Sequence, residues 1–362
     1  MKIGIVTIAQ GANYGNRLQN YAVQEVFRKM GCRAETIAYD TEYNCTVKLL
    51  LLHFIKAKIL RKKIYHLQKR DKFCIFNKQK INFSKKKYKC GEKFDISGYD
   101  MFSVGSDQVW NLYFKDIVEY RDLMFLTFVP AEKKIAYSAS IGTDKIPEEF
   151  KVFFANSVKD FSNISVRETQ GADIIEKHCD TRPETTIDPT LMLDRQKWVK
   201  FAKKPKNLPK KDFIVVYFIS SLSDDIKEYI KSASELHDCE VVTLKSGCAQ
   251  WVEIPDPKYF CADPQEFVYL ISHAKAVITD SFHASVFSII FKQPFRIFER
   301  KDLNMSSRTQ ELLDKIHIGK WCLGNISEPP ERIIDCDYTD VDEAIEQERQ
   351  KAFVYLKKAL NI

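Results

Sequence analysis

The sequence predicts an α/β protein of two domains, each built on a parallel sheet. Its 362 residues are too many for one small core and suit two domains of ordinary size. The chain opens with a strand, a helix and a second strand, a βαβ unit that places its strands parallel. A run rich in lysine and proline, residues 203–211, has the composition of a linker, and the same alternation begins again after it.

The elements of the first domain follow from hydrophobic periodicity. Residues 2–8 form an apolar run typical of a buried strand, and 18–30 show the spacing of an amphipathic helix that ends at Gly31. Residues 34–39 form the second strand, and the lysine-rich region from about 47 to 93 indicates a helical insertion. Further strands are expected at 101–104, 134–138, 164–166 and 185–187.

Strands and helices also alternate in the second domain. We expect strands at 213–219, 239–244 and 276–279, and helices at 224–237, 264–273 and from His283 onward. We therefore place an N-terminal domain at 1–205 and a C-terminal domain at 206–341. Residues 342–362 form a charged amphipathic helix that we expect to pack back on the N-terminal domain.

The basic character of the chain is concentrated in the insertion. The formal net charge is +7, but residues 56–93 hold 15 Lys or Arg and two acids, a local +13 that leaves 7 − 13 = −6 elsewhere. The apolar run at 47–55 is about half as long as a membrane-spanning helix. Residues 47–93 are either an interfacial helix drawn to anionic lipid or an ordinary solvated basic face. Nucleic-acid binding would need aromatic platforms or a known nucleic-acid-binding module.

Composition disfavours several other classes of site. The ten cysteines contain no CxxC pair, which indicates reduced thiols and neither a zinc site nor a disulfide framework. Glycine is scarce, at 12 residues, and no G-x-G-x-x-G fingerprint follows the first strand. The N-terminus shows no apolar stretch of signal-peptide length. We expect a cytoplasmic protein, peripheral at the inner face of the membrane, without a bound metal.

His283 is the first candidate for catalysis. The strand 276–279 ends in the polar pair Asp280 and Ser281, and His283 follows where a helix begins, the usual place for chemistry in open α/β sheets. Asp280 and Ser281 are near enough in sequence to fix the tautomer of His283 or share its proton. The competing interpretation is a structural histidine beside the core.

A polar loop between the first strand and the first helix is the second candidate. Asn13, Asn16 and Gln19 lie where a helix N-terminus offers free N–H groups to an anion or a sugar hydroxyl. The alternative is that these residues only turn the chain and cap the helix.

A third candidate directly follows the strand 101–104. Ser106, Asp107 and Gln108 supply donors and acceptors beside the aromatic ring of Trp110, a combination that can hold a sugar ring. The alternative is a helix cap at Ser106 or Asp107 with Trp110 in the core.

Two arginines could bind anions. Arg167 ends a strand and could fork onto a phosphate or carboxylate, although a salt bridge with Glu168 would explain it equally well. Arg308 opens a helix near 310–316 and could meet an anion there or stay solvated.

Taken together, five motifs in this order resemble the polysaccharide pyruvyl transferase family. They are Asn13-Tyr14-Gly15-Asn16 with Leu18-Gln19, Gly105-Ser106-Asp107-Gln108-Val109-Trp110-Asn111, Ser165-Val166-Arg167-Glu168, Asp188-Pro189-Thr190 and Thr279-Asp280-Ser281-Phe282-His283. The resemblance runs from residue 3 to about 316. It implies a GT-B-like fold with the active site in the inter-domain cleft. It also implies transfer of a group from phosphoenolpyruvate onto two sugar hydroxyls, which gives a cyclic ketal and free phosphate, with no further cofactor.

The resemblance also implies roles for these residues. Arg167 corresponds to the family's anion-binding arginine, His283 to an acid/base or phosphate-holding histidine, and Asp280 would orient His283. Some relatives carry Arg where this chain has Ser281, so Arg308 would have to help Ser281 and Arg167 at the donor. The acceptor half would be lined by Asn13, Asn16, Gln19, Ser106, Asp107, Gln108 and Trp110.

Two other functions remain open at this point. A GT-B glycosyltransferase that uses a nucleotide sugar would share the fold, and Glu299 could meet the donor ribose. A carbohydrate-binding protein without activity would keep the cleft only. For the transferase, the acceptor would be a cell-surface polysaccharide or its lipid-linked precursor, and a basic insertion on the membrane surface suits the latter.

Overall fold

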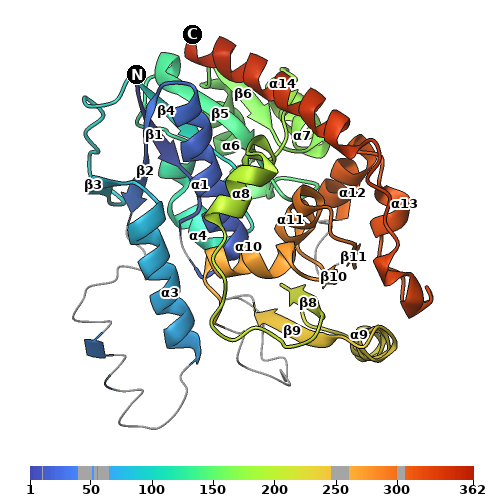
Figure 1. Ribbon diagram of the computed structural model, residues 1–362. Coiled ribbons are helices and arrows are strands. Elements are labelled where there is room, and N and C mark those ends of the chain that lie inside the picture. Colours follow the sequence, from blue (N-terminus) through green and yellow to red (C-terminus); the bar gives the residue numbers. More distant parts are fainter. Residues whose placement is uncertain (10, 40–50, 53–54, 56–64, 246–260, 300–305) are drawn as a thin grey trace.

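The computed structural model describes residues 1–9, 11–39, 51–52, 55, 65–245, 261–299 and 306–362. Two sheets with exclusively parallel pairing make up its centre, one of seven strands and one of four (Figure 1). The predicted fold class, two α/β units each built on a parallel sheet, is confirmed.

The seven-stranded sheet forms the N-terminal half, in the order β3-β2-β1-β4-β5-β6-β7. Its strands are β1 (Lys2–Val6), β2 (Arg33–Tyr39), β3 (Phe83–Tyr88), β4 (Met101–Val104), β5 (Lys134–Ala139), β6 (Asn163–Val166) and β7 (Glu184–Thr185). Strand β1 lies between β2 and β4, and helix α1 (Tyr14–Lys29) connects β1 to β2 as the predicted βαβ unit requires. Asn13 caps α1 by accepting a hydrogen bond from the Asn16 amide.

The four-stranded sheet forms the C-terminal half, in the order β11-β10-β8-β9. Its strands are β8 (Phe213–Phe218), β9 (Glu240–Lys245), β10 (Ala276–Thr279) and β11 (Phe295–Ile297). Strands β8 and β10 are buried throughout, as expected for the centre of a parallel sheet. The three-residue β11 was not predicted, because its apolar run continues from the preceding helix with only a short break.

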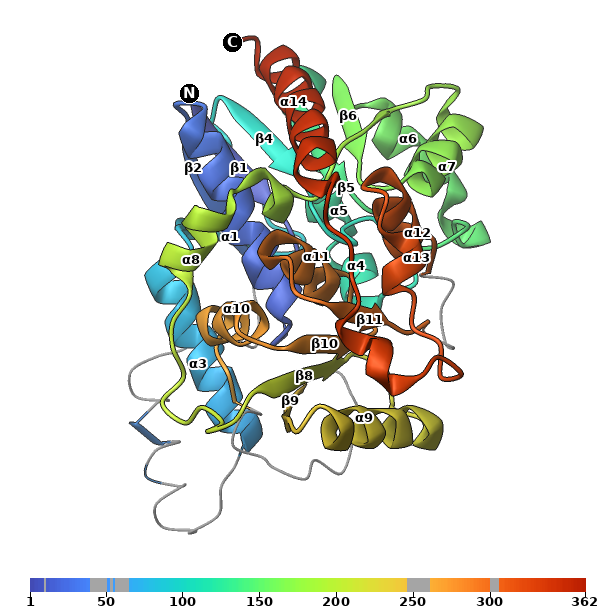
Figure 2. The same ribbon diagram turned by 45° about the vertical axis from the view of Figure 1, so that its right-hand side comes forward.

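The remaining helices pack around these sheets (Figures 1 and 2). They are α3 (Tyr65–Lys80), α4 (Lys115–Glu119), α5 (Arg121–Met124), α6 (Lys151–Lys159), α7 (Thr169–Cys179), α8 (Arg195–Phe201), α9 (Asp224–Leu236), α10 (Pro264–Ser272), α11 (Phe282–Phe291), α12 (Ser306–Lys315), α13 (Gly319–Cys322) and α14 (Val341–Leu360). Short 3₁₀ turns occur at Ala131–Lys133, Glu148–Phe150, Pro189–Met192 (η3) and Pro330–Ile334.

The basic insertion is only partly helical, which corrects the sequence prediction. Helix α3 is followed by strand β3, which pairs in parallel with β2 at the edge of the sheet. Ser84 and Tyr88 of β3 are buried while Lys85, Lys86 and Lys87 are exposed. Lysines on a solvent-facing edge strand are common because they discourage pairing with other chains.

Contact of the insertion with a membrane surface stays a prediction. Much of 47–64 lies outside the described residues, although Leu51, Leu52 and Ile55 are exposed. Among the helices of the described chain, none combines the length and the apolarity that crossing a bilayer requires.

The two halves share one hydrophobic core. A single cluster of buried residues joins Ile3 and Leu18 of the N-terminal half to Val215 and Phe287 of the C-terminal half. Trp198 of α8 lies inside this cluster.

Helix α14 returns to the N-terminal half, where Figures 1 and 2 show it beside the seven-stranded sheet. The Tyr355 hydroxyl of α14 donates a hydrogen bond to the Ala136 carbonyl of β5. No helix or strand is assigned between α8 and β8, the segment that contains the expected linker. The boundary placed between 205 and 206 stays a prediction.

Candidate active site

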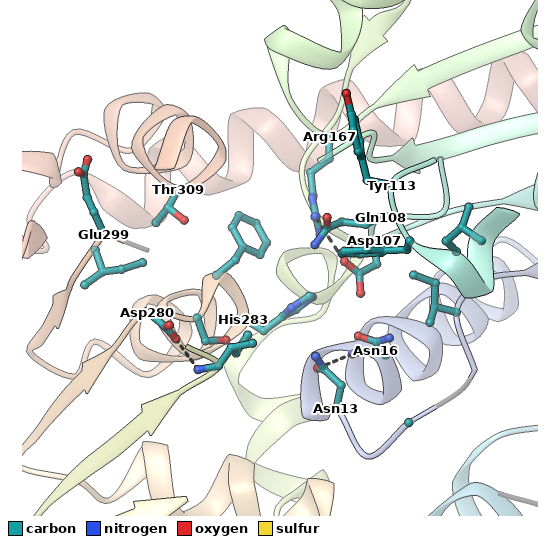
Figure 3. A pocket seen from close by; sticks show the side chains of 18 of the residues that line it. Asn13, Asn16, Asp107, Gln108, Tyr113, Arg167, Asp280, His283, Glu299 and Thr309 are labelled. Atoms are coloured by element: carbon teal, nitrogen blue, oxygen red, sulfur yellow. Dashed lines mark hydrogen bonds and ion pairs between the residues drawn. The ribbon is translucent and has the colours of Figure 1, made fainter. Parts of the chain in front are cut away.

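A cavity of about 560 Å³ lies where the carboxyl ends of both sheets face each other (Figure 3). Its lining residues follow strands or open helices on both halves, as expected for α/β folds. The N-terminal half contributes Ile8, Gly11, Asn13, Asn16, Asp107, Gln108, Tyr113, Phe114, Lys115, Asp116, Ile117 and Arg167; the C-terminal half contributes Ile219, Asp280, Ser281, Phe282, His283, Ile297, Phe298, Glu299, Thr309, Gln310 and Leu323.

His283 extends from the C-terminal half toward the N-terminal half. It lies in the first turn of α11, whose cap is Ser281, and only 7% of its surface is exposed. Figure 3 shows the ring directed toward Asp107 and away from Glu299 and Thr309. Nε2 has no hydrogen-bond partner among the described residues and lies 3.7 Å from Oδ2 of Asp188. A buried imidazole nitrogen without a partner is suited to exchange a proton with a bound ligand.

Asp188 connects the catalytic candidates and was not assigned a role from the sequence. Its carboxylate accepts hydrogen bonds from Nη1 of Arg167 (2.8 Å) and Oγ1 of Thr190 (2.6 Å). Burial alone would raise the pKa of Asp188, but His283 and Arg167 lower it far below the usual range. Asp188 is therefore a buried negative charge beside Arg167 and His283.

Arg167 is buried among three carboxylates. Besides Asp188, it lies 3.6 Å from Asp107 and 3.7 Å from Glu168, distances of ion pairs rather than hydrogen bonds. Burial alone would lower the pKa of Arg167, but Asp188, Asp107 and Glu168 raise it. Its guanidinium also covers the ring of Phe282 at 4.5 Å. Nε and Nη2 are buried and make no hydrogen bond within the described structure; Nε faces Glu168 and Nη2 faces Asp107.

The sequence predicted that Asp280 orients His283, but in the structure the Asp280 carboxylate is directed elsewhere. The carboxylate accepts hydrogen bonds from the backbone amides of Ile219 (2.7 Å) and Ser220 (2.8 Å) and so holds the loop after β8. Strands β8 and β10 are neighbours, so the residue after β10 meets the end of β8 rather than its own sequence neighbour. The carboxylate that lies within ion-pair distance of His283 is that of Asp188.

The predicted acceptor residues divide into two groups. Asn13, Asn16, Asp107 and Gln108 line the cavity as predicted. Gln19, Ser106 and Trp110 do not, which corrects those three assignments.

Each of these three side chains has a buried structural partner instead. Gln19 donates a hydrogen bond to Oγ1 of Thr7, and the Ser106 hydroxyl donates one to the buried carboxylate of Asp188. The indole of Trp110 is fully buried, where it donates to the Met124 carbonyl. The sequence alternative of a core Trp110 was correct.

Of the three residues predicted to bind the donor, two line the cavity and the side chain of the third is not described. Arg167 and Ser281 line the cavity, and Ser281 also accepts a hydrogen bond from the Ala284 amide of α11. Arg308 lies in α12, but its side chain is outside the described part of the structure. Glu299 lines the outer end of the cavity.

Two cavity residues had no clear signal in the sequence. Tyr113 supplies the exposed aromatic ring that we had expected from Trp110, and Thr309 supplies a hydroxyl from α12. For Asp188 a signal existed, since Asp188-Pro189-Thr190 was one of the five motifs.

Within the described residues, no three His, Cys, Asp or Glu side chains gather closely enough to hold a metal ion. Arg167 and His283, both next to the buried Asp188, line the cavity beside polar groups suited to hydroxyls, and they can bind an anion and transfer a proton.

Several solved structures resemble this chain at low identity. One is a UDP-GlcNAc 2-epimerase from Methanocaldococcus jannaschii in complex with UDP-GlcNAc and UDP; it is 10% identical, the match covers 98% of this chain and 100% of that chain, and the TM-score is 0.48. A UDP-N-acetylglucosamine 2-epimerase from Rickettsia bellii is 9% identical; the match covers 100% of this chain and 95% of that chain, with a TM-score of 0.46. A spinosyn rhamnosyltransferase is 8% identical; the match covers all of both chains, with a TM-score of 0.43. No curated protein matches by sequence.

The sequence itself matches a family over most of its length. The model of the polysaccharide pyruvyl transferase family matches residues 13–302, a range that includes all five motifs in full, together with the cavity residues Asn13, Asp107, Arg167 and His283. The chain therefore belongs to the polysaccharide pyruvyl transferase family.

Proposed function

We propose that this protein transfers the pyruvate moiety of phosphoenolpyruvate onto two hydroxyls of a saccharide. The observation that carries the proposal is the buried Arg167–Asp188–His283 arrangement, which opens into a cavity formed by both halves. It brings an anion-binding fork and a proton-transfer group to one place.

The donor lies between Arg167 and His283 in this proposal. Phosphoenolpyruvate carries a carboxylate and a phosphate, and a guanidinium fork can bind either group. Three carboxylates already surround Arg167 before the donor arrives. Each anionic group of the donor therefore competes with Asp107 and Glu168 for the guanidinium.

In this proposal His283 is the proton donor of the reaction. C3 of the enol gains a proton from Nε2 of His283, and a sugar hydroxyl adds to C2 and loses its proton. The second hydroxyl then displaces phosphate, so that two C–O bonds form, one C–O bond breaks, and a ketal and phosphate result. Two protons leave the hydroxyls, and one ends on C3 and the other on phosphate.

The acceptor is expected beside the carboxylate of Asp107. This residue lines the cavity with Gln108, Asn13 and Asn16, which offer the hydrogen bonds that sugar hydroxyls need. Asp107 is the carboxylate placed to receive a hydroxyl proton.

Donor binding is tested by thermal unfolding of the purified protein with phosphoenolpyruvate. A ligand at 100 times its Kd stabilises the folded state by about 2.7 kcal/mol, which raises Tm by several degrees. Arg167→Lys keeps the charge that the buried carboxylates need but loses the fork, so the rise should vanish while the protein stays folded. Arg182→Lys, on an exposed arginine that also pairs with two acids, is the matched control and should keep it.

Turnover is then followed as phosphate release with a panel of saccharides. His283→Gln should retain the rise in Tm and lose phosphate release. A Tm that phosphoenolpyruvate does not change, or that rises equally in Arg167→Lys, would contradict the donor site.

A glycosyltransferase with a nucleotide-sugar donor is the second candidate, because Glu299 lines the cavity from the C-terminal half. A rise in Tm with a nucleotide sugar that disappears in Glu299→Gln, without any response to phosphoenolpyruvate, would favour it.

A further inference from the structure

We infer that Gly15 is a positioning residue that fixes the His283 ring and holds its Nε2 beside Asp188. The inference rests on the proposed function for what His283 does, but its geometry is independent of it. A Cβ atom on Gly15 would lie 2.1 Å from Nδ1, 2.5 Å from Cγ and 2.7 Å from Cε1 of His283. Real Cβ atoms do not approach other atoms so closely, so every other residue at position 15 would displace the ring.

The backbone does not explain this glycine. Gly15 belongs to the first turn of α1 and, unlike the glycines of the turns, has no positive φ. Alanine in a helix is about 1 kcal/mol more favourable than glycine. A glycine at position 15 therefore costs the helix some stability, and the three atoms nearest to the missing Cβ all belong to the His283 side chain.

The same helical turn holds the two halves in register. Tyr14 stacks on Phe267 of α10 at 4.4 Å between ring centres, and its hydroxyl donates to the Ala262 carbonyl at 3.0 Å. Tyr14 thus holds the C-terminal half against helix α1, next to Gly15, against which the His283 ring packs. Asn13 and Asn16, on either side, line the cavity.

The ring orientation follows from these contacts. Nδ1 faces Gly15, while Nε2 lies on the Asp188 side without a hydrogen-bond partner among the described residues. Because His283 comes from one half and Gly15 and Asp188 from the other, the reactive nitrogen is defined only when both halves meet. A displacement of about 1 Å at a reacting group costs roughly 100-fold in rate.

A double-mutant cycle between positions 15 and 283 tests the inference. The proteins are wild type, Gly15→Ala, His283→Ala and the double variant, each measured by urea unfolding. Gly171→Ala is the matched control, since Gly171 also lies in the first turn of a helix and its Cβ would meet Glu168 at an ordinary 3.4 Å. We expect Gly15→Ala to lower the urea midpoint in the wild-type background and to leave it unchanged or raised in His283→Ala, where the new methyl group fills vacated space.

Two further readouts separate positioning from plain stability. The Cε1–H proton NMR signal of His283, identified by its absence in His283→Ala, should shift in Gly15→Ala and not in Gly171→Ala. Phosphate release from phosphoenolpyruvate with an active saccharide should fall about 100-fold in Gly15→Ala, with the Gly171→Ala rate unchanged.

Gly15→Ala with an unmoved His283 signal, or with the same change in midpoint in both backgrounds, would overturn the inference. The cycle and the NMR signal need no substrate. If phosphoenolpyruvate fails to bind wild type, the proposed function fails while the coupling of Gly15 to His283 is still decided.

Discussion

At the scale of single residues, Asp188 determines the electrostatics of the site. It accepts hydrogen bonds from a strand-end arginine and from its own η3 turn, and it lies beside a histidine of the other half. Arg167 and His283 hold its pKa far below the usual range, against the effect of burial. A group of this kind makes stability depend on pH.

The sign of that dependence can be worked out for Asp188. Its pKa is lower in the folded state than the ordinary value of about 3.9 in the unfolded state, so the unfolded state binds more protons below about pH 4. The contribution is complete above that pH and is lost as the pH falls, with a slope of up to about 1.4 kcal/mol per pH unit. We expect Asp188→Asn to unfold more easily at pH 7 and to lose less stability between pH 5 and pH 2, measured by urea unfolding at each pH.

The exposed Asp225→Asn is the control for this series, and it should keep the wild-type slope. Parallel slopes in wild type and Asp188→Asn would show that Asp188 is not the ionised partner described here.

The sequence predicted several polar residues of the cavity but not its charge network. Asn13, Asp107 and Arg167 were found because each follows a strand or opens a helix, a rule that needs no tertiary information. The partner of His283 was missed because sequence neighbours are not spatial neighbours at a strand end: Asp280 turned to the β8 loop, and Asp188 came from 95 positions away. Trp110 follows the left-handed Asp107, which redirects the loop and buries the indole.

At the scale of elements, helix α14 supports the turn that carries Asp188. Nε of Arg349 donates to the Leu191 carbonyl at 2.6 Å, and Nη2 donates to the Leu193 carbonyl at 3.1 Å. These carbonyls lie in and just after η3, the turn that begins after Asp188. The C-terminal helix therefore fixes a site residue that it does not touch.

Removal of this support should be visible in the backbone. We expect Arg349→Gln to lose about 1–3 kcal/mol of unfolding free energy and to speed amide hydrogen exchange in residues 188–193. The exposed Lys357→Ala on the same helix is the control and should leave both unchanged. Unaltered exchange in Arg349→Gln would mean that η3 holds its conformation without α14.

The elements themselves were well predicted where burial is complete. The strands at 101–104 and 276–279 have the predicted bounds, because a short apolar run between polar turns has few other structures open to it. Strand β3 was missed because its lysines gave no apolar alternation, and only pairing with β2 makes it a strand.

At the scale of the whole molecule, one hydrophobic cluster spans the two halves. Buried residues of α1, α8, α10 and α11 belong to a single cluster, and Trp198 touches both halves, through Tyr21 of α1 and Phe287 of α11. His283 comes from the C-terminal half and Gly15 from the N-terminal half. The site is therefore complete only while the two halves are packed together. Separation of the halves would expose this core, which is costly in water.

Trp198 can report whether the halves separate before they unfold. In a variant that carries Trp110→Phe, Trp251→Phe and Trp321→Phe, Trp198 is the single remaining tryptophan. We expect its fluorescence and the far-UV circular dichroism to change with one common midpoint in urea, since the cluster around Trp198 belongs to both sheets. If the halves came apart first, the fluorescence would change at lower urea while the helices and strands persisted. That outcome would mean that the His283 site opens by movement of the halves, and Gly15 would then act only in the closed state.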